Sequence, residues 1–167
     1  SRPNAVKPQP SDMVRREAAQ WHLPKAGIDF YLAGLRRSYA KARKGIARSL
    51  KDADVDGLHE ARKHVIHTLH HMELLGELWP DVKGLPLDEL NLLREALGDF
   101  NDLAELCAIA TPSALAGKAS HKRVHAALTK AKAKLLRRAR KKARRLFDRK
   151  PGTFAGRIGA MWETALG

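Results

Sequence analysis

Apolar residues recur at intervals of three and four along four long segments of the chain, and this spacing places them on one face of an α-helix. Alternating polar and β-branched residues are missing, as are Asn-Gly and Asp-Gly hairpin signals, so strands are not expected. The first predicted helix runs from Ile28 to about Leu50, and the second begins after an N-cap at Asp54 or Asp56 and ends before Pro80. The third begins at Gly84 or Pro86 and ends before Pro112, and the fourth runs from Ser120 to about Arg149. A short last helix runs from Pro151 to Trp162.

Short connections place consecutive helices antiparallel. We therefore predict an all-α fold, an antiparallel four-helix bundle with a short extra C-terminal helix, over residues 27–167. Residues 1–26 contain Pro3, Pro8, Pro10 and Pro24 and are predicted to be an N-terminal arm or linker, apart from a short helix near Ser11 to Trp21.

Charge is distributed unevenly along the chain. The net charge of +14 comes from 32 Lys and Arg against 18 Asp and Glu. Residues 118–150 hold 15 Lys or Arg and a single acid, Asp148, while residues 73–105 hold nine acids against Lys83 and Arg94. A strongly basic face raises the local concentration of polyanions, so the sequence favours a polyanionic partner.

The sequence contains no run of 18 or more apolar residues and no signal-peptide pattern, so we expect a soluble protein that does not enter the membrane. Cys107 is the only cysteine and has apolar neighbours, which favours a buried thiol. A reducing cytoplasm is the expected location.

The segment from Leu58 to His71 is dense in cationic side chains. On a helix, His59, Arg62, Lys63, His67 and His70 share one face. Like-charged neighbours destabilise a helix by a few tenths of a kcal/mol, about 0.2–0.5 per pair, and an anionic ligand would remove this penalty. The alternative interpretation is a solvated helix face.

Metal and catalytic interpretations have less support. His59 and Glu60 begin a zinc-protease pattern, but Lys63 stands where the second histidine is needed. Two histidine pairs, at positions 67 and 71 and at 121 and 125, have ligand spacing without a thiolate to complete a set. Glycine-rich phosphate loops do not occur. We predict that the chain is not an enzyme and carries no metal or cofactor.

The predicted fourth long helix is basic and has no aromatic residue before Phe147. Single-stranded nucleic acid is usually gripped by base stacking as well as by charge, whereas a polymer of phosphate offers nothing to stack. A nucleic-acid-binding module, or a module that docks an acidic partner, remains the alternative hypothesis.

Four stretches resemble the CHAD (conserved histidine α-helical) domain family, in the family's order: Tyr39 to Lys44, Leu58 to Lys63, Leu97 to Leu103, and Arg145 to Phe147 followed by Lys150, Pro151, Phe154 and Trp162. Such domains are helical and bind inorganic polyphosphate, in some members at polyphosphate granules. The resemblance implies the same ligand here. Members usually contain two four-helix units beside a basic channel, and this chain resembles the second, which implies a missing N-terminal half-unit or a homodimer.

The resemblance also implies site residues. The matched positions are Tyr39, Arg43, His59, Arg62, Lys63, Asp99 and Asp102, of which Asp102 is expected to orient a cation or a helix end. His64, Ile66 and the added histidines depart from the basic family pattern. Because imidazole titrates near about pH 6.5, we expect tighter binding at pH 6 than at pH 8. The predicted polyphosphate-binding residues are Arg36, Tyr39, Arg43, Lys44, His59, Arg62, Lys63, His67, His70, Lys134, Arg137, Arg138 and Lys141.

Overall fold

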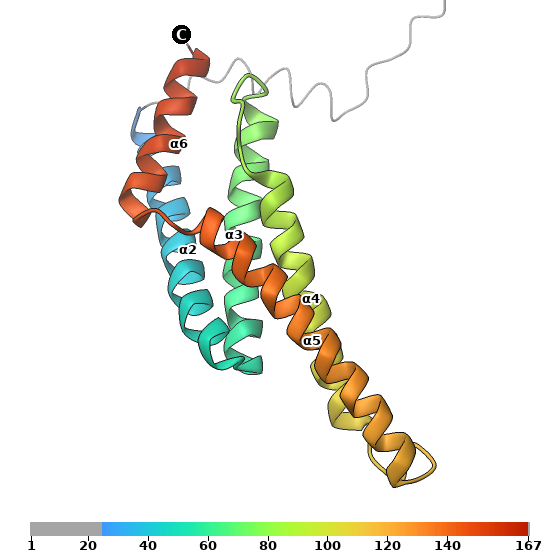
Figure 1. The fold of residues 1–167 in the computed structure, drawn as a ribbon. Helices are drawn as coiled ribbons and strands as arrows, with labels where there is room; N and C mark the ends of the chain where they lie inside the picture. Colours follow the sequence, from blue (N-terminus) through green and yellow to red (C-terminus); the bar gives the residue numbers. More distant parts are fainter. Residues whose placement is uncertain (1–24, 167) are drawn as a thin grey trace, which may run out of the picture.

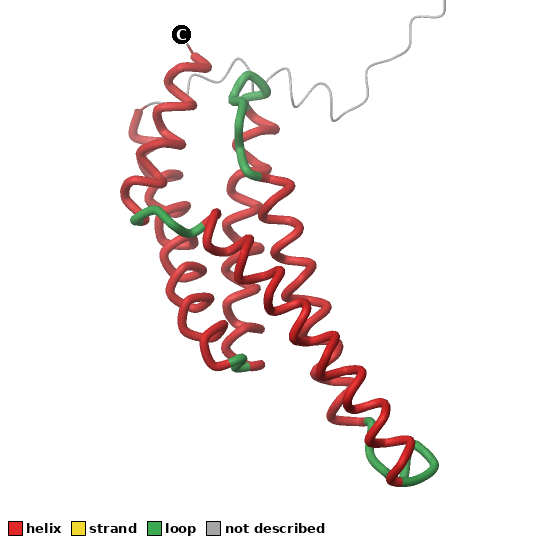
Figure 2. The backbone as a smooth tube through the Cα atoms, viewed as in Figure 1, coloured by secondary structure: helices red, strands yellow, loops and turns green. Residues whose placement is uncertain are grey.

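The computed structural model describes residues 25–166, so the predicted N-terminal arm and its short helix near Ser11 to Trp21 lie outside the described residues. Within that range the chain is helical and contains no strand, which confirms the all-α prediction (Figures 1 and 2). The helices are α2 (Lys25–Asp52), α3 (Val55–Leu78), α4 (Leu87–Ile109), α5 (Lys118–Leu146) and α6 (Pro151–Leu166).

Helix α3 packs against both α2 and α4, α5 packs along α4, and α6 packs on α2. The C-terminal end of α5 also reaches α2. The C-terminal part of α4 and the N-terminal part of α5 form a hairpin that projects beyond α2 and α3 (Figure 1). The bundle therefore has a fully packed end and an end made of two helices alone.

The turn between α2 and α3 depends on backbone geometry. Ala53 adopts a positive φ of 51° and Asp54 is the N-cap of α3, as predicted, although its carboxylate makes no capping hydrogen bond. A Cβ on Gly57 would lie 2.2 Å from Ser49 Oγ and 2.4 Å from Asp54 Oδ2. A larger residue at this position would have to displace both side chains, so the absence of a side chain at Gly57 lets Ser49 and Asp54 lie close to the start of α3.

The core contains most of the predicted apolar stripes. Large side chains at 2% exposure or less are Leu35, Tyr39, Leu58, Val65, Met72, Leu75, Leu90, Leu93, Leu97, Phe100 and Ile158. Helix α5 differs from the expectation, because only Ala139 and Ala143 of its apolar face are buried. Cys107, predicted to be buried, is half-buried. Both differences arise where the hairpin runs past the helices that would cover it.

Candidate functional site

A groove with a volume of about 690 Å³ lies between the C-terminal halves of α2 and α5. The charged side chains that line it are five cations, Arg43, Lys44, Lys51, Arg140 and Arg144, and one acid, Asp148. The remaining lining residues are apolar: Ile46, Ala47, Leu50, Ala143 and Phe147. Five positive charges around one concave surface give it a positive electrostatic potential, which attracts anions.

Two arginines of the groove are fixed by backbone carbonyls of the opposite helix. Arg43 of α2 donates from Nε to the carbonyl of Phe147, the C-cap of α5, at 3.0 Å. Arg140 of α5 donates from Nη2 to the carbonyl of Leu50, in the last turn of α2. Each arginine therefore satisfies a carbonyl that its partner helix leaves free. The guanidinium groups are held in place before any ligand arrives, which lowers the entropy lost on binding.

Tyr39 anchors the turn that carries the Phe147 carbonyl. Its hydroxyl donates to the carbonyls of Leu146, at 3.0 Å, and Arg149, at 3.2 Å. The ring stacks on Phe154 with centroids 3.9 Å apart and planes 9° apart. Burial, followed by the charge of Asp148, raises the pKa of Tyr39 to about 12. A side chain that is 1% exposed has no surface for a ligand, so the expected contact of Tyr39 with phosphate is corrected to a positioning role.

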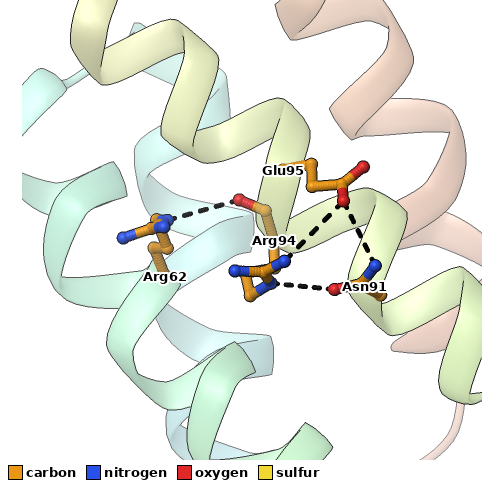
Figure 3. A network of polar contacts seen from close by, with 4 residues as sticks. All are labelled: Arg62, Asn91, Arg94 and Glu95. Atoms are coloured by element: carbon orange, nitrogen blue, oxygen red, sulfur yellow. Dashed lines mark hydrogen bonds and ion pairs between the residues drawn. The ribbon is translucent and has the colours of Figure 1, made fainter.

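His59 and Arg62 line a second groove, of about 250 Å³, between α3 and α4. Asn101 donates from Nδ2 to Nδ1 of His59 at 3.2 Å. Arg62 donates from Nε to the carbonyl of Arg94 at 3.3 Å (Figure 3). This groove also contains four carboxylates, Glu95, Asp99, Asp102 and Glu105. It shares no lining residue with the basic groove. Arg43, His59 and Arg62, all predicted to bind the same ligand, therefore do not line one groove.

A comparison with protein-family models gives one match, the CHAD domain, over residues 5–111 of the 167. The chain belongs to the CHAD family. The match includes the first three stretches that resemble the family and ends before the fourth. The domain boundary that we place at residue 27 stays a prediction. No curated protein and no solved structure matches the chain.

The CHAD stretches pack in pairs. Arg62 lies over Gly98, where a Cβ would be 3.3 Å from its Nε and Nη2 atoms, and His59 is bonded to Asn101. The stretch around Tyr39 meets the aromatic residues of the fourth stretch. Glycine at position 98 thus makes room for an arginine between α3 and α4. Several residues that identify the family also hold its helices together.

The other predicted cations lie on exposed surfaces. Arg36 lies beside the start of α6, where a Cβ on Gly152 would be 3.9 Å from its guanidinium carbon. Lys63 pairs with Glu60 at 2.6 Å. The four predicted α5 cations, Lys134, Arg137, Arg138 and Lys141, are exposed, as are His67 and His70 on α3. No histidine lines the basic groove. The expected pH dependence therefore has no group in this groove to produce it.

Sequence reasoning missed Arg140, Arg144 and Lys51 as groove residues. Arg140 and Arg144 each follow an alanine, Ala139 and Ala143, that is buried. Small buried residues four apart mark a side of a helix on which a neighbouring helix comes close. This signal identifies the arginines at the edge of such a contact, although it does not identify the neighbouring helix.

Most charges of the described residues are not paired with each other. Between residues 25 and 166 the ion pairs are Lys63 with Glu60 and Arg94 with Glu95. The described part holds no group of three or more His, Cys, Asp and Glu side chains arranged for a metal ion. None of its helices is long and apolar enough to cross a membrane. None of the five cations of the basic groove is in an ion pair with another described residue, so each can pair with a ligand from solution.

Proposed function

We propose that this CHAD domain binds inorganic polyphosphate in the basic groove between α2 and α5. The observation that carries the proposal is the concentration of five cations against one carboxylate in a single groove. Membership of a family of polyphosphate-binding modules supports the same ligand. The proposed contacts are from Arg43, Lys44, Lys51, Arg140 and Arg144 to non-bridging phosphate oxygens.

The chemistry of the groove suits a repeating anion. Arginine can bond two oxygens with its planar fork, whereas lysine acts as a point charge on a flexible stem. Arg43 and Arg140 each use one nitrogen on a carbonyl, which leaves the other guanidinium nitrogens for phosphate. Binding then consists of charge-assisted hydrogen bonds together with release of the counterions around the polymer.

The polymer extends beyond the groove along α5 in this proposal. Arg144 lines the groove, and Lys141, Arg137 and Lys134 follow it at intervals of three and four residues on exposed helix surface. Through this row, three of the four predicted α5 cations would contribute to binding without lining the groove. It also implies that longer polymers bind more tightly than short ones, because they reach more cations.

We further propose that the chain acts as a binding module and not as an enzyme. A family of binding modules supports this assignment. Where polyphosphate is stored as granules, such a module would collect on them. The incomplete channel implied by the family resemblance would be completed by a second half-unit or by a second copy of the chain.

The test is a titration of labelled polyphosphate of defined lengths, followed by competition with duplex DNA and with RNA at matched phosphate concentration and salt. The proposal predicts that unlabelled polyphosphate displaces the probe at concentrations where nucleic acid does not. Displacement by nucleic acid at similar phosphate concentration would instead support a general nucleic-acid-binding module. Absence of polyphosphate binding would refute the proposal.

A further inference from the structure

Six residues of α4 form an exposed row with the spacing of a coiled-coil seam. Leu92, Glu95, Asp99, Asp102, Leu106 and Ile109 follow each other at intervals of three, four, three, four and three, and every one is exposed. We call this row the acidic seam. Leu106 and Ile109 are 46% and 69% exposed, which is unusual for large apolar side chains so close together. The spacing is that of residues that pack against a parallel or antiparallel neighbouring helix.

Helix α5 carries a row with the same spacing and the opposite charge. The basic seam consists of Ala127, Lys130, Lys134, Arg137 and Lys141, at intervals of three, four, three and four, and all five are exposed. None of its cations is in an ion pair with a carboxylate of the described residues. Two complementary rows therefore exist on one hairpin without contacting each other.

Both seams lie on the same side of the hairpin. At 100° per residue, each seam is turned by about 130° from the positions that face the other helix. The turn has the same angle and the same sense when each helix is viewed from its own N-terminus. Because the two helices run antiparallel, this brings both seams to one side of the hairpin. Helix α3 packs on the opposite side of α4, where Leu90, Leu93 and Leu97 are buried. The side with the seams has no cover among the described helices.

The hairpin that carries the seams is not covered by a core. No residue between positions 102 and 138 is buried, so the projecting part of the hairpin has no core of its own. Asn101, 9% exposed, lines the groove that contains Asp99 and Asp102, and its buried Oδ1 atom has no hydrogen-bond partner among the described residues.

We infer that a second copy of the chain covers this side of the hairpin, with the acidic seam of each copy on the basic seam of the other. Two seams of opposite charge on one surface are self-complementary under a two-fold axis, so one contact serves both copies. The four helices of the two hairpins then form an antiparallel bundle. Leu106 and Ile109 lose their exposure in it, and cations of the partner's basic seam lie opposite the exposed carboxylates of Asp99 and Asp102.

Net charge opposes this association, since each chain carries +14. Salt weakens both this repulsion and the attraction between the seams, so salt dependence alone does not test the contact. Exchanging the charges of the seams does test it. A pair of variants that fail alone and recover when mixed requires the two surfaces to meet.

The experiment is sedimentation velocity of the full chain over a wide concentration range, without polyphosphate. One variant carries Asp99→Lys and Asp102→Lys, and the other carries Lys134→Glu and Arg137→Glu. We expect the parent chain to form dimers and each variant alone to lose at least about tenfold in self-association, because like charges then face each other. An equimolar mixture of the two variants is expected to form heterodimers.

The matched control is Glu73→Lys with Glu77→Lys, which makes the same charge change as Asp99→Lys with Asp102→Lys but at exposed positions of α3. It should weaken self-association only through the higher net charge, and therefore less than the seam variant does. Ile109→Arg is a second seam variant whose side chain is too exposed to disturb the core. A parent chain that stays monomeric throughout, a mixture that does not recover, or a control that loses as much as the seam variant would overturn the inference. The variants leave the five cations of the basic groove unchanged, so binding of a short polyphosphate tests the groove separately. Lys134 and Arg137 also belong to the row proposed for longer polymers, so a second copy and a long polymer compete for this row, and the experiment is done without polyphosphate.

Discussion

Replacing Lys44 and Arg144 together by glutamine should weaken polyphosphate binding by about 30-fold. Both side chains line the basic groove, and neither makes a hydrogen bond or ion pair with another described residue, so their loss removes charge without removing a structural contact. An exposed ionic contact contributes up to about 1 kcal/mol, and two together contribute about 2 kcal/mol. At 1.4 kcal/mol per factor of ten, this energy corresponds to the stated change.

Salt dependence gives a second magnitude for the same variant. Each cation that contacts a phosphate chain contributes about −0.7 to −0.9 to the slope of log K against log salt concentration. Five groove cations thus give a slope of about −3.5 to −4.5, and the double variant should lose about 1.4 to 1.8 of it. Fluorescence anisotropy with a short labelled polyphosphate, at four or so salt concentrations, measures affinity and slope together.

The matched control replaces Lys122 and Arg123, two exposed cations near the start of α5, by glutamine. Its net charge equals that of the groove variant, but these residues do not line the groove. A short polymer held in the groove should bind the control almost as it binds the parent. Equal losses of affinity and slope in the two variants would show that binding follows total charge, and the groove would not be the site.

Three further outcomes follow from contacts in and near the bundle. Tyr39→Phe keeps the stack on Phe154 but removes the hydroxyl that bonds the carbonyls of Leu146 and Arg149. The free energy of unfolding should therefore fall by about 1 kcal/mol and the melting temperature by about 2–4 °C. Circular dichroism measures this change, and an unchanged melting temperature would refute the anchoring role. Polyphosphate affinity should change less than about twofold between pH 8 and pH 6, because no histidine lines the basic groove, and a tenfold gain at pH 6 in the same titration would return the histidines to the site. Burial, and next to it the charge of Lys41, lowers the pKa of His64, so the unfolded chain takes up this proton at a higher pH than the folded one. The free energy of unfolding should therefore fall as the pH drops below about 6.5, and urea denaturation of His64→Leu should show a smaller fall; an identical pH dependence in both proteins would contradict the assignment.

Helix positions were predictable from the sequence because periodicity is a local property. The spacing from Ile28 to Leu50 describes a single helix whatever packs against it, and the structure places that helix at Lys25–Asp52. Burial along α5 was not predictable in the same way. Val124 and Leu128 have the correct spacing for a core face but are half-buried, because a sequence pattern shows which side of a helix is apolar and not whether another helix reaches it.

The candidate site was predictable in part for the same reason. The face shared by His59 and Arg62 follows from their spacing, but its neighbour is set by tertiary packing, which turned out to be the acidic helix α4. Arg43 and Lys44 were identified from the family stretch, whereas Arg140 and Arg144 join them only because α5 ends against α2. Partners distant in sequence are chosen by the whole fold, so a single helix face cannot specify them.

Helix dipoles offset part of the mutual repulsion among the five cations of the basic groove. The groove lies where the C-terminal halves of α2 and α5 overlap, and the C-terminal end of a helix carries a partial negative charge. Lys51 lies in the last turn of α2 and Arg144 in the last turn of α5, where this charge favours cations. The same partial charges oppose an arriving phosphate, which moderates affinity inside the groove. The row from Lys141 to Lys134 runs away from the end of α5 and lacks this opposition. If polyphosphate binds as proposed, a polymer long enough to leave the groove should therefore gain more affinity per phosphate than a short one.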